Sequence, residues 1–148
     1  MKIITDPKHL SKVCDPVDYK TSKQIANKMI LFMLSHKNIG DNSVGLACNQ
    51  LGLSGRIIIV KMKNKWVQFI NPIISYKSDQ TIITEESCLS VPNKSIKIER
   101  STDITIYYEK GNPDGNYGWE SHFTGMDAIV IQHEIDHLNG IIITDKEL

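Results

Sequence analysis

The chain has 148 residues, 41% of them hydrophobic and 23% charged, which suits one domain over residues 1–148 with an ordinary core. Its 17 basic and 17 acidic residues balance, so no net charge draws the whole chain to nucleic acid or to a membrane. The opening MKIITDPKHL lacks the unbroken apolar stretch of a signal peptide, and no aliphatic run is long enough to span a bilayer. Three cysteines without a framework spacing favour a reducing cytoplasm over a disulfide-stapled secreted module.

The first predicted element is an amphipathic helix over 21–36. Its apolar residues Ile25, Met29, Phe32 and Met33 recur at i, i+4, i+7 and i+8, which places them on one face. The glycine-rich stretch 39–55 that follows indicates a loop around a short extended piece.

β-Branched and aromatic residues dominate the middle of the chain and predict strands. We expect turns at Asn64 and at 111–115, and an interruption at Asn71-Pro72. The expected strands cover 56–63, 65–70, 73–76, 81–84, 95–100, 102–108 and 117–123. Strands in runs with a helix toward each end predict an α+β fold, with mixed or antiparallel strands packed around the last helix.

That last helix is predicted over 124–139. Thr124 followed by Asp127 resembles a capping box, and Gly140 stands where a C′ glycine ends a helix. One stripe along the helix is expected to face the core and carries Met126, Ile129, Val130, His133 and His137.

Residues 133–137 read HEIDH and indicate metal chemistry. Two imidazoles four positions apart project from one face of a helix, roughly 6 Å apart, which suits two ligands of one metal. Glu134 is offset from them and can reach a water on that metal as a general base. The motif therefore predicts a metal-dependent hydrolase.

A catalytic site of this type usually has a third protein ligand. One class of zinc enzyme takes a histidine six residues after the second one, but that position is Ile143. Another class takes a glutamate from a later helix, and Glu147 is the lone glutamate after His137. The third ligand is therefore expected upstream, where Cys88 lies between a predicted strand and the Val91-Pro92 break.

Three segments together resemble the peptide deformylases. They are VGLACNQ at 44–50, ESCLS at 86–90 and QHEIDH at 132–137, in that order. The resemblance implies hydrolysis of the formyl group from N-formylmethionine at the start of nascent chains, with release of formate, as part of N-terminal methionine processing in protein biosynthesis.

The resemblance also implies the metal site. Cys88, His133 and His137 would bind one divalent metal with water as the fourth ligand. Family members typically use Fe²⁺, and Zn²⁺ or Ni²⁺ can substitute. Glu134 would take the proton of the water and then deliver one to the departing amine.

Substrate contacts are implied around the same site. The Gln50 side-chain amide and the Leu89 backbone N–H would stabilise the oxyanion. Residues 44–46 would pair with the substrate like an added strand, and Gly45 would let the substrate backbone approach closely. Arg100 would support the peptide portion. The contact residues are thus Val44, Gly45, Leu46 and Arg100, with Met126, Ile129 and Val130 lining a pocket for the methionine side chain.

The chain departs from the family pattern at Ser43 and Ser87, where the first and second motifs usually have glycine, and at Cys48, where alanine is usual. A required positive φ at either serine would cost about 1 kcal/mol or more. None of the proposed ligands or reacting groups is altered, so we expect activity.

Bacterial members typically continue past the last motif into a helix implicated in ribosome docking, whereas 141–148 here allows a short strand or tail. That resembles the compact deformylases encoded by some viruses of bacteria. We expect a monomer acting on formylmethionyl peptides in the cytoplasm of a bacterium, or of the bacterial host of a phage. Any ribosome contact is expected to be transient, without a C-terminal docking helix, and no nucleic-acid or membrane partner is expected.

Two other functions fit the HEIDH motif. One is a different small metallo-amidase or peptidase, although the usual peptidases with this motif use neither a ligand like Cys88 nor a group like Gln50. The other is a non-catalytic binding module held together by its metal, which would need a fourth protein ligand.

Overall fold

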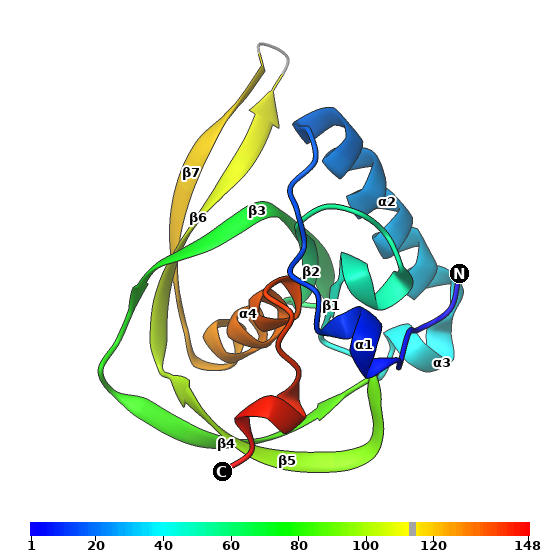
Figure 1. Ribbon diagram of the computed structural model, residues 1–148. Helices are drawn as coiled ribbons and strands as arrows, with labels where there is room; N and C mark the ends of the chain where they lie inside the picture. The colour runs from blue at the N-terminus through cyan, green and yellow to red at the C-terminus, as the bar shows by residue number, and fades with distance from the viewer. Residues whose placement is uncertain (113–114) are drawn as a thin grey trace.

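The computed structural model describes residues 1–112 and 115–148, and in this part of the chain seven strands form two antiparallel sheets (Figure 1). The larger sheet has the order β1-β2-β3-β6-β7, and the smaller one is the β4–β5 hairpin. The strands are β1 (Gly45–Ala47), β2 (Ile57–Met62), β3 (Lys65–Lys77), β4 (Thr81–Cys88), β5 (Val91–Ser101), β6 (Asp103–Asn112) and β7 (Gly115–Thr124). The predicted α+β class with antiparallel strands is confirmed. Residues 113–114 of the expected turn lie outside the described residues.

The two long helices cover β2. Successive residues of this strand, Ile57 to Val60, are all fully buried, which requires cover on both of its faces because side chains alternate. Both α2 (Tyr19–Ser35) and α4 (Gly125–Leu138) contact β2. The short helices are α1 (Pro7–Leu10) and α3 (Lys37–Gly40), with 3₁₀ helices η1 (Cys48–Leu51) and η2 (Ile143–Lys146). No helix in the described ranges is long and apolar enough to cross a bilayer.

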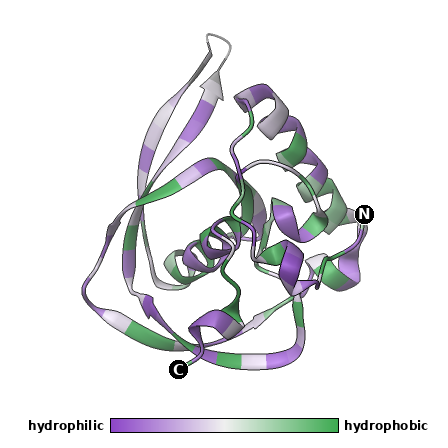
Figure 2. Cartoon of the chain, viewed as in Figure 1, coloured by the Kyte–Doolittle hydropathy of each residue, from purple (hydrophilic) through white to green (hydrophobic). Residues whose placement is uncertain are grey.

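Helix α2 confirms the prediction from periodicity and begins two residues earlier than expected. The Asp18 side chain accepts a hydrogen bond from the Thr21 backbone N–H at 3.1 Å, which caps the N-terminus. The side chains that it buries are apolar except for Ser22, whereas Leu31 and Leu34 are exposed. Figure 2 shows this as hydrophobic and hydrophilic residues alternating along the helix.

Strand β3 runs through Asn71-Pro72, where an interruption was expected. Asn71 adopts a positive φ of 52°, and the β3–β6 register shifts between Ile70 and Ile73. A bulge therefore absorbs the proline, which cannot donate to the ladder. Strand β5 begins at Val91 rather than Ser95, so the expected break at Val91-Pro92 is wrong.

Helix α4 has the expected end but not the expected cap. Thr124 is the N-cap residue, yet its side chain makes no capping hydrogen bond, so the predicted capping box does not form. At the other end, Gly140 has φ 75°, its N–H bonds the His137 carbonyl, and the Ile141 N–H bonds the Asp136 carbonyl. This is a Schellman motif, which fixes the helix terminus close after His137.

Candidate metal centre

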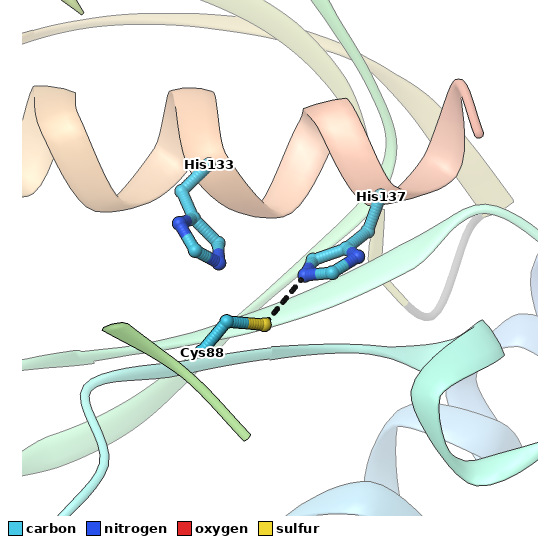
Figure 3. Close-up of side chains that lie close together, drawn as sticks. All are labelled: Cys88, His133 and His137. Carbon is cyan, nitrogen blue, oxygen red and sulfur yellow. Dashed lines mark hydrogen bonds between the residues drawn. The ribbon is translucent and has the colours of Figure 1, made fainter. Parts of the chain in front are cut away.

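Three potential metal ligands from two distant segments of the sequence lie close together (Figure 3). Cys88 ends strand β4, whereas His133 and His137 project from one face of α4. The ligand atoms of the three residues all lie within 4.8 Å of one another, and Cys88 Sγ lies 3.3 Å from His137 Nε2. The structure thus brings together the three residues that the sequence assigned to a metal.

An irregularity in the small sheet positions Cys88. Glu86 pairs with Ile96, but Cys88 pairs with Val91, so the register shifts between them and β5 carries the extra residues. Asn93 in that extra segment has a positive φ of 63°. A bulge bends a strand and redirects its side chains, and here it occurs beside the residue whose sulfur must reach α4.

Gln132 fixes α4 against the same hairpin. Its buried side-chain amide donates from Nε2 to the Ser101 carbonyl at 2.9 Å and accepts from the Ser101 backbone N–H at 3.1 Å. This two-bond link sets the position of the helix one residue before His133, so that the first imidazole faces Cys88.

His133 is held by a buried carboxylate. Its Nδ1 lies 2.8 Å from Glu86 Oε1, which leaves Nε2 facing Cys88 and His137. Burial opposes a charge on this imidazole, but contacts with Cys88 and Glu86 outweigh burial and raise the pKa of His133 to about 10. A carboxylate that is hydrogen-bonded to the ring nitrogen not used for the metal orients a metal-binding imidazole and increases its basicity.

Arg100 supports Glu86 and is not among the residues that line the pocket. Its guanidinium donates to both Glu86 oxygens, at 2.8 and 2.9 Å, and to Asp136 Oδ2 at 2.6 Å. The side chain is 2% exposed. Burial alone would raise the pKa of the Glu86 carboxyl, but hydrogen bonds from Arg100 and His133 outweigh burial and hold that pKa well below its usual range.

His137 is a neutral ligand. Burial and the neighbouring charge of His133 lower the pKa of His137 to about 3, so its imidazole is neutral near pH 7. Asn49 ties this end of α4 to η1, because its Nδ2 donates to the His137 carbonyl at 2.9 Å. Two imidazoles and one thiol are a ligand set that suits zinc or ferrous iron.

Glu134 lies beside the ligands with its carboxylate buried. Its Oε1 is 3.8 Å from His133 Nε2 and 4.0 Å from His137 Nε2. Burial raises the pKa of Glu134 to about 7, although the charge of His133 opposes this shift. Glu134 Oε2 is buried without a hydrogen-bond partner among the described residues, as expected for an oxygen that serves a water or substrate.

Gly45 is required by Glu134 itself. A Cβ at this position would lie 2.9 Å from Cγ and Oε2 of Glu134 and 2.9 Å from Val130 Cγ1. The expected reason for this glycine was close approach of a substrate, and the structure adds the packing of Glu134 as a second reason.

Gln50 is oriented from η1. Its Oε1 accepts from the Ala47 backbone N–H at 2.9 Å, which directs Nε2 toward Ser90 Oγ at 3.0 Å and Cys88 Sγ at 3.6 Å. An amide whose oxygen is already bonded presents its N–H groups to the site, beside Leu89 at the hairpin tip.

A pocket of about 680 Å³ opens beside the ligands. The predicted contact residues that line it are Val44, Gly45, Gln50, Leu89, Met126, Ile129 and Val130. Leu46 does not line the pocket: its side chain is fully buried in the core, and its backbone pairs with Ile59. Of residues 44–46, the first two therefore face the pocket and the third anchors the strand.

The two serines that replace family glycines adopt ordinary backbone angles. The positive-φ positions of the described residues include neither Ser43 nor Ser87. Ser43 Oγ donates to the Ile39 carbonyl at 2.7 Å, and Ser87 is exposed. The serines therefore impose no left-handed strain.

Glu86, Ser90 and Asp136 belong to the site, and sequence reasoning did not single them out. Glu86 carried a usable signal, because a residue two positions before a ligand in a strand lies on the same face. Asp136 and Ser90 carried none, since their partners Arg100 and Gln50 are more than 30 positions away in the sequence.

Three converging ligands, a buried carboxylate and an adjoining pocket define a mononuclear metallohydrolase. The family model described as polypeptide deformylase matches residues 1–147. The peptide deformylase of Karelsulcia muelleri is 37% identical over 152 residues, which cover 97% of this chain and 76% of that protein. The chain belongs to the peptide deformylase family.

Solved structures agree with this assignment. The crystal structure of peptide deformylase from Thermotoga maritima has a TM-score of 0.83 and 35% identity, covering 100% of this chain and 96% of that one. A Met-Ala-Ser-bound class I type b peptide deformylase from Acinetobacter baumannii has a TM-score of 0.83 and 29% identity, covering 99% and 97%.

Metal loading near pH 8 is expected to release at least one proton. The pKa of His133 is about 10 without metal, and a histidine must be neutral to bind one, so the metal displaces its proton. His137 contributes none, because its pKa is about 3. Zinc titration of metal-free protein in weak buffer with a pH indicator measures the release, and imidazole ¹⁵N signals assign it. Binding without proton release would contradict an imidazolium at His133.

Proposed function

We propose that this chain hydrolyses the N-formyl group of formylmethionyl peptides and releases formate and the free peptide. The observation that carries the proposal is the buried Glu134 carboxylate beside three converging ligands at an open pocket. A site that only holds a fold together is closed by four protein ligands, whereas three cluster here among the described residues.

Cys88, His133 and His137 would hold the metal, for which we propose Fe²⁺ with Zn²⁺ or Ni²⁺ as substitutes. When bound, such an ion polarises the formyl carbonyl and acidifies water. The thiol and two imidazoles suit each of these ions, and metal supply rather than affinity order decides which is loaded.

Glu134 moves the proton in this proposal. Its carboxylate accepts a proton from the attacking water and passes one to the departing amine nitrogen, which breaks the C–N bond. A carboxyl whose pKa lies near 7 can do both at neutral pH, because neither its charged nor its protonated form is strongly favoured.

Gln50 and Leu89 stabilise the charge that develops on the formyl oxygen. The Gln50 amide is pre-oriented by Ala47, so it needs no reorganisation during the reaction. Leu89 adds its backbone N–H from the hairpin tip, where it lines the pocket together with Cys88.

The substrate backbone pairs with β1, and the methionine side chain enters the apolar part of the pocket. In the sheet order, β1 has a partner on one side, so its other edge can accept an extended peptide. Val44 and Gly45 provide that edge, and the apolar wall consists of Val44, Met126, Ile129 and Val130. The Met-Ala-Ser tripeptide bound by the similar Acinetobacter protein supports a short methionyl peptide.

The location we propose is the cytoplasm of a bacterium or of a phage-infected host cell, where formylmethionyl chains are made. We propose that the protein acts there as a monomer, with at most a transient ribosome contact.

Formate release from formyl-Met-Ala-Ser tests the function. Protein loaded with Fe²⁺ without oxygen is expected to release formate from this peptide and to leave unformylated Met-Ala-Ser intact. Chelator-treated protein is the control. Cleavage of a peptide bond without formate would indicate a peptidase, and no turnover at full metal loading would indicate a binding module.

A further inference from the structure

A chain of alternating charges links the 3₁₀ helix η2 to the metal site. Lys146 Nζ lies 3.2 Å from Asp136 Oδ1 and 3.1 Å from Oδ2. Asp136 Oδ2 accepts a hydrogen bond from Arg100, and Arg100 donates two further hydrogen bonds to Glu86. Glu86 Oε1 in turn lies 2.8 Å from Nδ1 of His133. We call these five residues the ion-pair chain. It runs from solvent to a metal ligand without a gap.

The helix η2 that carries Lys146 is itself fixed. Ile143 is 3% exposed and packs in a small cluster with Ile96 and Ile98 of β5. The Asp145 side chain accepts from the Ile142 N–H at 2.9 Å, and the Leu148 N–H bonds the Lys97 carbonyl at 3.1 Å. These contacts attach η2 to the β4–β5 hairpin, which also carries Glu86 and Cys88.

We propose that Lys146 is a positioning residue for His133. It acts through Asp136, Arg100 and Glu86, and so makes η2 part of the support of the metal site. The inference rests on the metal site of the proposed function, but it concerns metal retention, which can be measured without turnover.

Lys146 acts on the ion-pair chain through its contact with Asp136. Its carboxylate is 14% exposed and binds two cations, so both oxygens are held. Without Lys146, the carboxylate has Arg100 as its remaining cationic partner and can rotate with it. Arg100 donates one hydrogen bond to each carboxylate oxygen of Glu86. A shift of the guanidinium therefore moves the carboxylate that orients the His133 ring.

The size of the effect follows from exposure. Changing a residue that directly supports a ligand typically costs 10- to 100-fold in metal affinity. Lys146 is 34% exposed and separated from the ligand by three intervening residues, so its contribution is smaller. We expect metal to leave Lys146→Met roughly three- to tenfold faster than it leaves wild type.

The experiment measures the rate of Co²⁺ loss to a chelator, followed by the cobalt–thiolate absorption of Cys88. Lys146→Arg keeps the cation and is expected to restore slow loss. Lys97→Met removes an exposed lysine from the neighbouring strand and serves as the matched control, with a rate equal to that of wild type. Urea unfolding of each metal-free variant separates local from global effects.

The outcomes are distinct. Faster metal loss from Lys146→Met, with slow loss in both Lys146→Arg and Lys97→Met, supports the proposal. Unchanged metal loss in Lys146→Met overturns it, whether or not the metal-free protein is less stable. If wild type retains cobalt normally but releases no formate, the proposed function fails while this inference stands.

Discussion

Glu134→Gln is expected to lower formate release about 10²- to 10⁴-fold while the metal content stays unchanged. Glutamine keeps the shape of the side chain but cannot take a proton from water. It does not affect the ligands, because Glu134 Oε1 lies 3.8 and 4.0 Å from the two histidine nitrogens. Kinetics with formyl-Met-Ala-Ser and metal analysis of the same sample provide the measurement.

Glu120→Gln makes the same chemical change at an exposed position of β7 and is expected to leave the rate unchanged. A Glu134→Gln variant with more than a tenth of the wild-type rate and full metal loading would exclude Glu134 as the general base.

The same variant has a second, independent consequence for stability. Burial raises the pKa of Glu134 from 4.5 to about 7, so the folded metal-free protein binds this proton more tightly than the unfolded chain. The contribution of Glu134 to the free energy of unfolding therefore falls as pH rises from 4.5 to about 7 and is lost above that pH. In Glu134→Gln this decline is expected to disappear, as urea unfolding at several pH values can show.

Arg100→Met is expected to destabilise the metal-free protein by about 3 to 5 kcal/mol. The substitution leaves the buried Glu86 carboxylate without its two guanidinium hydrogen bonds. Urea unfolding measures the loss. Arg100→Lys keeps the charge but cannot span both Glu86 oxygens, so an intermediate loss is expected.

The effect of Arg100→Met depends on pH. The pKa of Glu86 is held below its usual range in the folded protein, so its contribution is present above the pKa of the unfolded chain and is lost as pH falls below it. The wild type should therefore lose stability toward acid more steeply than the variant. A loss below about 1 kcal/mol at neutral pH would show that the Arg100–Glu86 pair is not a structural requirement.

Arg100→Met also distinguishes a role of Arg100 in holding Glu86 from a role in binding the substrate. Because the guanidinium lies outside the pocket, fully metal-loaded variant is expected to have a KM within about twofold of wild type. A large rise in KM alone would restore the substrate contact that the resemblance implied.

Much of the fold could be predicted because its signals are local. The apolar period of α2 and the β-branched run of β2 depend on neighbours within a few residues, and both elements formed as expected. The last helix was equally clear, since the pattern from Met126 to His137 and the glycine at 140 lie in one continuous segment.

The errors occurred where long-range pairing overrides local preference. Asn71-Pro72 reads as a break in isolation, but pairing with β6 continues the strand around a bulge. Val91 starts β5 because Cys88 pairs with it across the hairpin. The predicted cap at Thr124 was wrong in a different way: Thr124 occupies the N-cap position, but its hydroxyl makes no capping hydrogen bond.

The HEIDH segment by itself predicted two metal ligands and a general base on one helix, because helical spacing alone places His133 and His137 on the same face. The ordered motifs then identified Cys88 and Gln50. Only the tertiary structure decided that Arg100 binds Glu86, that Gly45 makes room for Glu134, and that Lys146 joins the ion-pair chain. Helical spacing follows from covalent geometry, whereas these contacts join residues from separate elements and depend on how those elements pack.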